Sequence, residues 1–176
     1  TYDQDTGQLF DSVSDPRHNV LERIVAGSRY AKVSVDTSQG GNFQIFDTCA
    51  FNLVTTAIGS RILPATSTSG RCIWTNCTAS FGNTNQGLSV GSGAFSWMNK
   101  PGSTAITGAT LPTNLIATTG TNLFSVLLDG LDLSALGSGK SIVGGTQSAL
   151  VNIVNCKLGA SVTVSSTPAN ANALGI

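Results

Sequence analysis

Four cysteines, Cys49, Cys72, Cys77 and Cys156, are the residues of this chain with the most versatile chemistry. A thiolate can bind a metal ion or attack an electrophile, and two thiols can form a disulfide. Cys72 and Cys77 have four residues between them, but no second pair follows. Zinc sites typically combine four ligands of this kind. We therefore expect no metal site and no cofactor.

Asp129 and Asp132 are the only close pair of carboxylates after residue 36. Glycoside hydrolysis uses two carboxylates that flank one glycosidic bond. Residues three apart on a strand point to opposite faces, so only a bend at Gly130 would bring these two together. Asp47 could join them only if neighbouring repeats stack. A structural turn explains Asp129 equally well, and we predict no catalytic residue.

Two other motifs suggest chemistry and are better explained without it. His18 is the only histidine, so any nucleophile–histidine arrangement would need it, and we interpret it as a solvated residue of a charged segment. Residues 137–141, Gly-Ser-Gly-Lys-Ser, look like the end of a phosphate-binding loop, but Ser134 occupies the position that requires the first glycine. Residues 76–78 have the form of a glycosylation acceptor, and we prefer a structural turn there.

Trp74 and Trp97 are the aromatic residues best suited to binding a sugar ring. Exposed rings could hold a glycan next to Asp129 and Asp132, with Phe95 as a further contact. Burial in a core or in a seam between subunits is the interpretation that we prefer.

The cysteines belong to segments that look alike: Phe46–Phe51, Trp74–Ala79 and Val154–Leu158, with Leu128–Leu131 carrying glycine in place of cysteine. The matching positions 49, 77, 130 and 156 are separated by 28, 53 and 26 residues, so the middle interval contains a hidden repeat. A period in the twenties made of short strands is typical of a coil that stacks turn on turn.

Asn99 fits the hidden repeat. The turn positions then form a series with steps of 28, 23, 30 and 26 residues: Thr48, Asn76, Asn99, Asp129 and Asn155. Asn and Asp tolerate left-handed backbone and suit sharp corners, and a small apolar residue fits an inward position after each corner. The predicted structural ladder consists of Cys49, Cys77, Gly130, Cys156, Asn76, Asn99 and Asn155. Stacked cysteines would be free buried thiols or, at Cys49 and Cys77, a bridge between neighbouring strands.

Three parts of the chain differ in pattern. Residues 1–14 are polar and predict an N-terminal arm. Residues 15–27 begin with Asp-Pro, end with Gly and carry apolar residues at helical spacing, which predicts a short helix that caps the coil. Residues 28–176 form the strand domain. Its predicted strands are 43–46, 49–54, 71–74, 77–81, 94–98, 104–106, 123–128, 131–133, 141–143, 149–154, 156–158 and 161–165.

The charge pattern narrows the range of partners. Nine basic and nine acidic residues give no net charge, which excludes electrostatic attraction to nucleic acid or to an anionic membrane. Only 10% of residues are charged, against about 25% in typical domains. Residues 72–99 and 101–128 contain no charge at all. A neutral β-surface of this kind favours an oligomer, and the start at Thr1 suggests a processed product or a piece of a longer chain.

The repeated turn of Ile73–Ala79 and Ile153–Leu158, an apolar residue, Asn, Cys and a further apolar residue, resembles the right-handed parallel β-helix class. The resemblance covers roughly residues 28–165. This class includes pectate-lyase-like enzymes and bacteriophage tailspike and virion proteins, and the chain looks most like a phage structural protein. The alternative fold is an antiparallel β-sandwich or jelly roll, which also produces many short strands.

The resemblance implies a non-enzymatic structural component of a phage virion, either a capsid-decorating or a tail-associated protein. Its partners would be copies of itself, with a homotrimer favoured, and other virion proteins. The first alternative is a tailspike-like module that binds or degrades a polysaccharide through Trp74, Trp97, Asp129 and Asp132. The second is a fragment of a bacterial surface adhesin.

Overall fold

The computed structural model describes residues 8–10, 19–22, 25–26, 34–35, 43–53, 60–63, 71–84, 87–90, 93–118, 124–145 and 149–165. All regular secondary structure in these ranges is β-strand, and the strands form three sheets. No helix in the described part of the chain is long and apolar enough to span a membrane.

Sheet B has seven strands. In spatial order it contains β16 (Ala149–Val154), β14 (Phe124–Leu133), β11 (Gly93–Thr104), β8 (Arg71–Thr75), β5 (Phe43–Asp47) and β2 (Asn19–Glu22), with β17 (Lys157–Leu158) paired to the end of β14.

Sheets A and C complete the fold. Sheet A contains β1 (Gln8–Phe10), β4 (Ser34–Val35), β7 (Ser60–Leu63), β10 (Leu88–Val90), β13 (Asn114–Thr118), β15 (Ser141–Gly145) and β18 (Thr163–Ser165). Sheet C contains β12 (Ile106–Thr110), β9 (Thr78–Gly82), β6 (Ala50–Leu53) and β3 (Val25–Ala26). Each sheet ends on two terminal strands, so the described strands do not close into a barrel.

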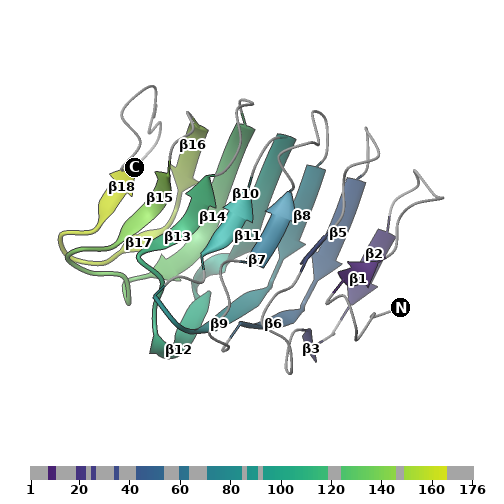
Figure 1. The fold of residues 1–176 in the computed structure, drawn as a ribbon, viewed down its shortest axis with the longest axis horizontal. Coiled ribbons are helices and arrows are strands. Elements are labelled where there is room, and N and C mark those ends of the chain that lie inside the picture. The colour runs from purple at the N-terminus through teal and green to yellow at the C-terminus, as the bar shows by residue number, and fades with distance from the viewer. Residues whose placement is uncertain are drawn as a thin grey trace.

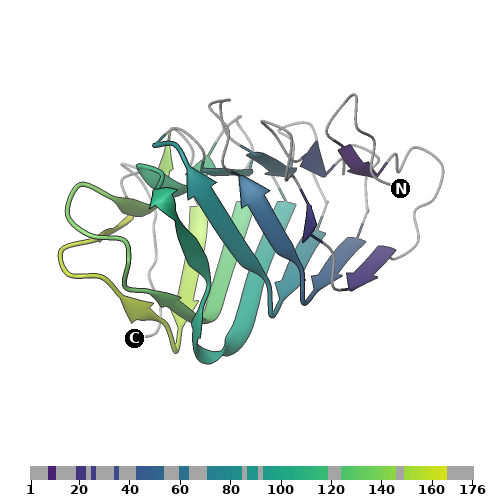
Figure 2. The ribbon, with the colours of Figure 1, turned by 90° about the horizontal axis from the view of Figure 1, so that it is seen from below.

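Successive strands along the chain belong to different sheets. From β2 to β13 the chain contributes one strand to sheet B, then to sheet C, then to sheet A, and repeats this order. Every pairing between the described strands is parallel, which excludes the antiparallel sandwich for these residues. Figures 1 and 2 show the strands following one another along the long axis, from purple to yellow.

The register of sheet B gives the repeat its length. One aligned column contains Asp47, Thr75, Met98, Asp129 and Val154, at separations of 28, 23, 31 and 25 residues. These separations are close to the predicted steps of 28, 23, 30 and 26. The last two steps differ by one residue because Gly130, and not Asp129, lies at the fourth corner.

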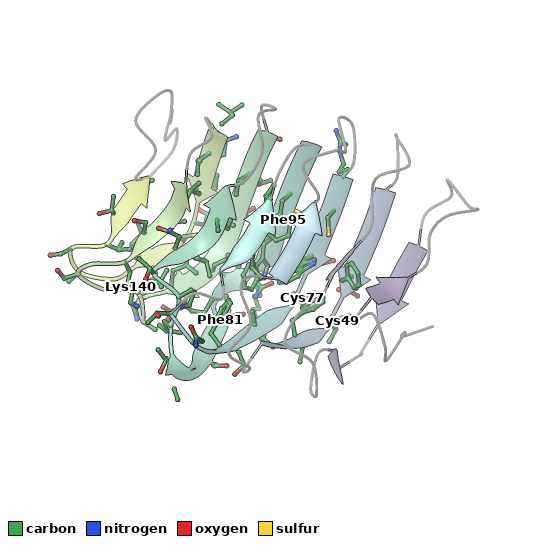
Figure 3. All side chains as sticks on the ribbon, in the orientation of Figure 1. Cys49, Cys77, Phe81, Phe95 and Lys140 are labelled. Carbon is green, nitrogen blue, oxygen red and sulfur yellow. The ribbon has the colours of Figure 1, made fainter. Side chains whose placement is uncertain are left out.

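The core lies between the sheets because alternate residues of each strand point inward. In β8, Cys72 and Trp74 are buried, whereas Arg71, Ile73 and Thr75 are more accessible. The neighbouring column of sheet B is buried along the stack and contains Phe46, Trp74, Trp97, Leu128 and Ile153. Cys49, Cys77, Phe81 and Phe95 also belong to this core (Figure 3).

Aromatic rings fill the core around Trp74. The Phe51 ring stacks on Trp74 with a centroid distance of 3.9 Å and an interplanar angle of 3°. Phe95 and Trp97 pack edge-on against Trp74 at 5.3 and 5.1 Å. Because aromatic side chains bury large areas and such pairs add further stabilisation, this cluster is a major source of core stability.

The predicted capping helix at 15–27 is wrong for its described residues. Asn19–Glu22 and Val25–Ala26 form β2 and β3, which pair with β5 and β6. Parallel pairing gives the main chain of β2 its hydrogen-bond partners, and Val20 and Val25 are β-branched residues that suit strands. The remaining residues of that range lie outside the described structure.

The predicted arm at 1–14 is described only at Gln8–Phe10. These residues form β1, which pairs with β4 at the end of sheet A. The division of the chain into arm, cap and strand domain therefore stays a prediction.

Candidate functional site

Three of the predicted corners have a left-handed backbone. Thr48 and Asn76 lie where the chain passes from sheet B to sheet C, and Asn155 lies between β16 and β17. Their φ angles are 53°, 52° and 52°. A left-handed backbone at three equivalent positions is costly for most residues, and Asn is among the types that tolerate it best. The sequence series therefore identified three real corners.

At the fourth corner the residue is Gly130, with φ of 73°, and not Asp129. The register aligns Asp129 with Met98 of β11 and with Val154, the last residue of β16, so the predicted series is displaced by one residue here. Leu131, which is buried, follows the corner as Cys156 does in the next repeat. A Cβ atom at position 130 would lie 2.1 Å from the main-chain oxygen of Asn99, which explains the glycine.

Asn99 lies at the predicted turn position, but its role differs from that of the corner residues. Its side chain accepts a hydrogen bond from the main-chain nitrogen of Cys77 at 3.1 Å and donates one to the Cys77 oxygen at 2.9 Å. The register of β11 shifts between Met98 and Ser103, where Lys100–Gly102 are exposed. The amide thus supplies the pairing that the main chain of β11 does not supply at this point.

Two corner asparagines bind the carboxylate of the preceding repeat. Asn76 Nδ2 donates to Asp47 Oδ1 at 3.4 Å, and Asn155 Nδ2 donates to Asp129 Oδ1 at 3.2 Å. Asp47 and Asp129 each lie directly before a corner residue, so the same contact recurs at two places in the stack. Asp129 is therefore engaged in holding neighbouring repeats together.

None of the four cysteines forms a disulfide, and the thiols of Cys49, Cys77 and Cys156 donate to main-chain oxygens. Cys77 Sγ lies 3.3 Å from the oxygens of both Phe46 and Thr75. Cys49 Sγ donates to the Asp47 oxygen at 3.4 Å, and Cys156 Sγ donates to the Leu128 oxygen at 3.5 Å. The Cys49–Cys77 bridge that the spacing permits is not formed, and the ladder consists of thiols.

Burial makes Cys72, Cys77 and Cys156 poor nucleophiles and poor metal ligands. It raises the pKa of Cys77 to about 12, and it raises the pKa values of Cys72 and Cys156 as well. A thiol reacts and binds metals as the thiolate, so near neutral pH these groups stay protonated. In the described residues, no three His, Cys, Asp or Glu side chains form a group that could hold a metal ion.

The two tryptophans face the interior. Both have no exposed surface, so neither presents a ring face to a sugar, and Phe95 is equally buried. Trp97 Nε1 donates to the Cys77 oxygen at 3.1 Å. Trp74 Nε1 has no hydrogen-bond partner in the described structure. Trp74 lowers the pKa of the nearby Cys72 thiol, but burial has the larger effect and raises it.

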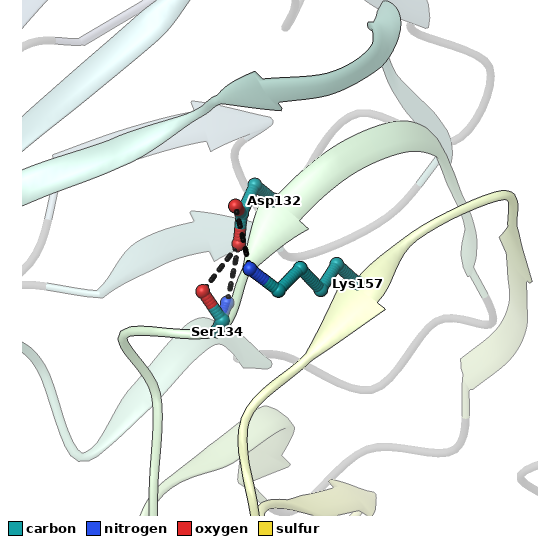
Figure 4. Close-up of polar contacts among 3 residues, drawn as sticks. All are labelled: Asp132, Ser134 and Lys157. Atoms are coloured by element: carbon teal, nitrogen blue, oxygen red, sulfur yellow. Dashed lines mark hydrogen bonds and ion pairs between the residues drawn. The ribbon is translucent and has the colours of Figure 1, made fainter.

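Asp132 forms a polar cluster with Ser134 and Lys157 (Figure 4). Its Oδ1 accepts hydrogen bonds from Ser134 N at 2.9 Å and from Ser134 Oγ at 2.5 Å. Lys157 Nζ lies 3.5 Å from Oδ2, in register with Asp132 on β17. The bonds from Ser134, and then the Lys157 charge, hold the pKa of Asp132 below its ordinary value.

The two carboxylates of the predicted catalytic pair have different partners. Asp129 binds Asn155, whereas Asp132 binds Ser134 and Lys157. The bend at Gly130 is present, as a shared site would require. The side chains are nevertheless committed to two separate structural contacts.

The remaining candidates also have structural roles or lie outside the described residues. Residues 137–141 form a turn, closed by the Lys140 N to Gly137 O hydrogen bond of 3.1 Å, and lead into β15 and not into a helix. Lys140 Nζ donates to the Leu111 oxygen at 2.7 Å, so this lysine is not presented to a phosphate. His18 lies outside the described residues.

Neither Ser134 nor Lys157 is among the site residues predicted from the sequence. An aspartate followed two residues later by serine is a known turn signal and would have identified the first. Lys157 could be paired with Asp132 only by a register that treats Gly130, and not Asp129, as the corner.

Comparison of the chain with protein-family models, curated proteins and solved structures finds no match.

Proposed function

We propose that the chain is a right-handed parallel β-helix that serves as a structural, non-enzymatic component of a bacteriophage virion. The cyclic order of sheets B, C and A supports the coil, as does parallel pairing between residues 23 to 31 positions apart. A coil of this kind is a rigid scaffold, and such a scaffold suits a capsid-decorating or tail-associated protein.

The observation that carries the proposal is the use of the reactive side chains as links between neighbouring repeats. Asn76 and Asn155 bind the aspartates of the preceding repeat, and Asn99 pairs with the main chain of Cys77. Cys77 donates to the oxygen of Phe46, which belongs to the preceding repeat. Groups that would supply chemistry in an enzyme here supply cohesion along the stack.

The proposed partners are copies of the same chain, with a homotrimer favoured, and other virion proteins. Charged residues make up only 10% of the chain, so its surface offers little electrostatic repulsion between copies. Residues 1–14 are proposed to extend to a neighbouring subunit and bind it. The polysaccharide alternative is not favoured, because Trp74 and Trp97 are fully buried and Asp129 and Asp132 are bound to different partners.

The test is size-exclusion chromatography with light scattering over a wide range of concentration, together with glycan-binding and polysaccharide-cleavage assays. We expect an oligomer and neither glycan binding nor cleavage. A stable monomer that cleaves or binds a polysaccharide would overturn the proposal in favour of the tailspike-like alternative.

A further inference from the structure

The outward side chains of sheet B form three columns that run along the stack, and together we call them the outer face of sheet B. Alternate residues of each strand point away from the core, so every second position belongs to this face. The first column contains Arg71, Ala94, Ser125 and Leu150, and the second contains Ile45, Ile73, Ser96, Leu127 and Asn152. The third contains Asp47, Thr75, Met98, Asp129 and Val154. None of these side chains is buried.

The outer face of sheet B carries apolar side chains in all three columns. Leu150 is 46% exposed and is one of the two large apolar side chains that the described structure leaves exposed. The second column, in the middle, has no charged residue and includes Ile45, Ile73 and Leu127. Parallel sheets are usually covered on both faces, and exposed apolar patches on proteins mark contact surfaces. This face therefore has the composition of a surface that is covered.

The charges of the face lie at its two borders and have opposite signs. Arg71, at the start of β8, belongs to the first column and is exposed. Asp47 and Asp129 belong to the third column, at the other end of the strands. A symmetric contact that brings the first column of one copy to the third column of another therefore pairs opposite charges.

The width of the face matches closure around a three-fold axis. Strands of five residues, such as β5 and β8, span about 17 Å at a rise of about 3.3 Å per residue. Packed sheets lie about 10 Å apart, so each main chain lies about 5 Å from the centre of the packed layer. A triangle whose sides lie about 5 Å from its centre has sides of about 17 Å. Three copies of this face thus enclose a filled core, in which the three middle columns meet on the axis.

We propose that the outer face of sheet B is the surface on which three copies of this chain pack, about a three-fold axis parallel to the stack. This inference rests on the proposed function, because it names the surface through which the copies associate. Ile73 and Leu127 of the middle column form the apolar centre of the contact. The same two borders meet at each of the three contacts, and the rotation closes the ring.

Arg71 and Asp47 form the charged pair of this contact. The three-fold rotation brings the start of each strand to the end of the equivalent strand of the next copy. Arg71 then faces Thr75 of the next copy, and Asp47 lies one strand away, at about 4.8 Å. Asp47 Oδ1 accepts a hydrogen bond from Asn76, and a carboxylate has a second oxygen that an arginine can bind.

Asp129, the other acidic residue of the face, is bound within its own chain. It accepts a hydrogen bond from Asn155 at 3.2 Å, and the start of its strand in the next copy carries the uncharged Ser125. The contact therefore sets no like charges against each other.

The first test exchanges the charges of the Arg71–Asp47 pair. Arg71→Glu sets a carboxylate beside Asp47 of the next copy, and we expect it to weaken association at least about tenfold in sedimentation equilibrium, most strongly at low salt. Combining it with Asp47→Arg restores opposite charges and should return association to near the wild-type level. Thr113→Glu with Ser138→Glu shifts the net charge by the same amount at exposed positions outside sheet B and should associate like the wild type.

The second test places a charge at the apolar centre. Leu127→Lys brings three ammonium groups together near the axis, and we expect monomers at concentrations where the wild type is trimeric. Ser96→Lys tests the same column at a smaller side chain, in case Leu127→Lys disturbs the fold. Thr107→Lys, which adds the same charge on the exposed part of β12, is the matched control and should stay trimeric. Thermal unfolding checks that each variant is folded.

The outcomes separate this inference from the proposed function. A wild-type chain that stays monomeric at all concentrations overturns both. A wild-type oligomer that Leu127→Lys, Ser96→Lys and Arg71→Glu leave unchanged overturns this surface and leaves the structural function standing. A wild-type dimer overturns the three-fold packing. A double variant that stays as weak as Arg71→Glu overturns the Arg71–Asp47 pair, and with it the order of the copies around the axis.

Discussion

The side-chain amide of Asn99 pairs with both main-chain groups of Cys77, accepting from its nitrogen at 3.1 Å and donating to its oxygen at 2.9 Å. The amide mimics a peptide group and bridges two repeats at the point where the register of β11 shifts. The Cys77 oxygen also accepts the Trp97 indole N–H, so this one residue joins the corner to the aromatic core.

Asn99→Ala should therefore destabilise the fold. The substitution leaves the Cys77 nitrogen without its partner and the Cys77 oxygen with one donor in place of two. Leaving a buried polar group unpaired costs about 1 to 3 kcal/mol, and we expect a loss in that range in urea unfolding. Asn152→Ala, on the outer face of β16, is the matched control. Equal losses for the two variants would contradict the bridging role.

Gly130→Ala should be more destabilising than Gly102→Ala. Both glycines have left-handed backbone, with φ of 73° and 80°, so both substitutions incur a conformational cost of about 1 to 2 kcal/mol. At position 130 a Cβ atom would also lie 2.1 Å from the Asn99 oxygen, whereas at position 102 no atom lies within 4 Å. Urea unfolding of the two variants isolates the steric part. Similar unfolding free energies would show that the corner can relax around a methyl group.

Asp132 should make stability depend on pH in acid. Its pKa is lowered from the ordinary value of 3.8 in the folded state, so the folded chain binds a proton less readily than the unfolded chain. The stability from this carboxylate is present above about pH 4 and is lost as the pH falls through the folded-state pKa. Asp132→Asn keeps an acceptor for Ser134 but removes the charge.

The measurement is the urea midpoint of the wild type and of Asp132→Asn at neutral and at acid pH. We expect the wild type to be the more stable at neutral pH and the difference to shrink as the pH falls. The effect should be small, because Lys157 is 67% exposed and surface ion pairs are weak. A difference that grows in acid would contradict the assigned direction.

Local sequence signals predicted sheet B well. The strand predicted at 149–154 has those bounds in the structure, and the strand at 43–46 is β5 with one more residue. The corners at Thr48, Asn76 and Asn155 followed from residue type and spacing. Each of these features depends on a few neighbouring residues, which is the information that a single sequence contains.

Sheet A was largely missed for a physical reason. Its strands β7, β10 and β13 have three to five residues and lie between segments rich in Gly, Ser, Thr and Asn. Parallel strands pair with segments a whole repeat away, as Leu88 does with Ile116, so no hairpin signal marks them.

Two errors came from signals that tertiary pairing overrides. Asp15, Pro16 and Gly27 have the types that begin and end a helix, yet the described residues between them pair with β5 and β6. At the fourth corner, Asp129 was matched to the asparagines by residue type. Only the register reveals that Gly130 makes the corner, because a displacement of one residue leaves the composition of the repeat unchanged.

Cys156 should be the first thiol to react with iodoacetamide in the native chain. It is partly exposed, whereas Cys72 and Cys77 are buried and burial raises their pKa values, that of Cys77 to about 12. Burial raises the pKa of Cys156 as well, but this thiol is partly exposed and can meet the reagent, whereas Cys72 and Cys77 are covered and stay protonated near pH 8. Mass spectrometry of timed samples should find Cys156 modified well before Cys72 and Cys77, which should react only as fast as the chain opens.

The same reaction in urea provides the control, because unfolding removes the burial that raises the pKa values and all the thiols should then react at similar rates. Cys156→Ser should abolish the early modification and leave the slow phase unchanged. Native modification of Cys77 as fast as that of Cys156 would mean that the Cys77 thiol does not stay bonded to the oxygens of Phe46 and Thr75. The thiol ladder would then be an open surface, and its role in joining neighbouring repeats would have to be abandoned.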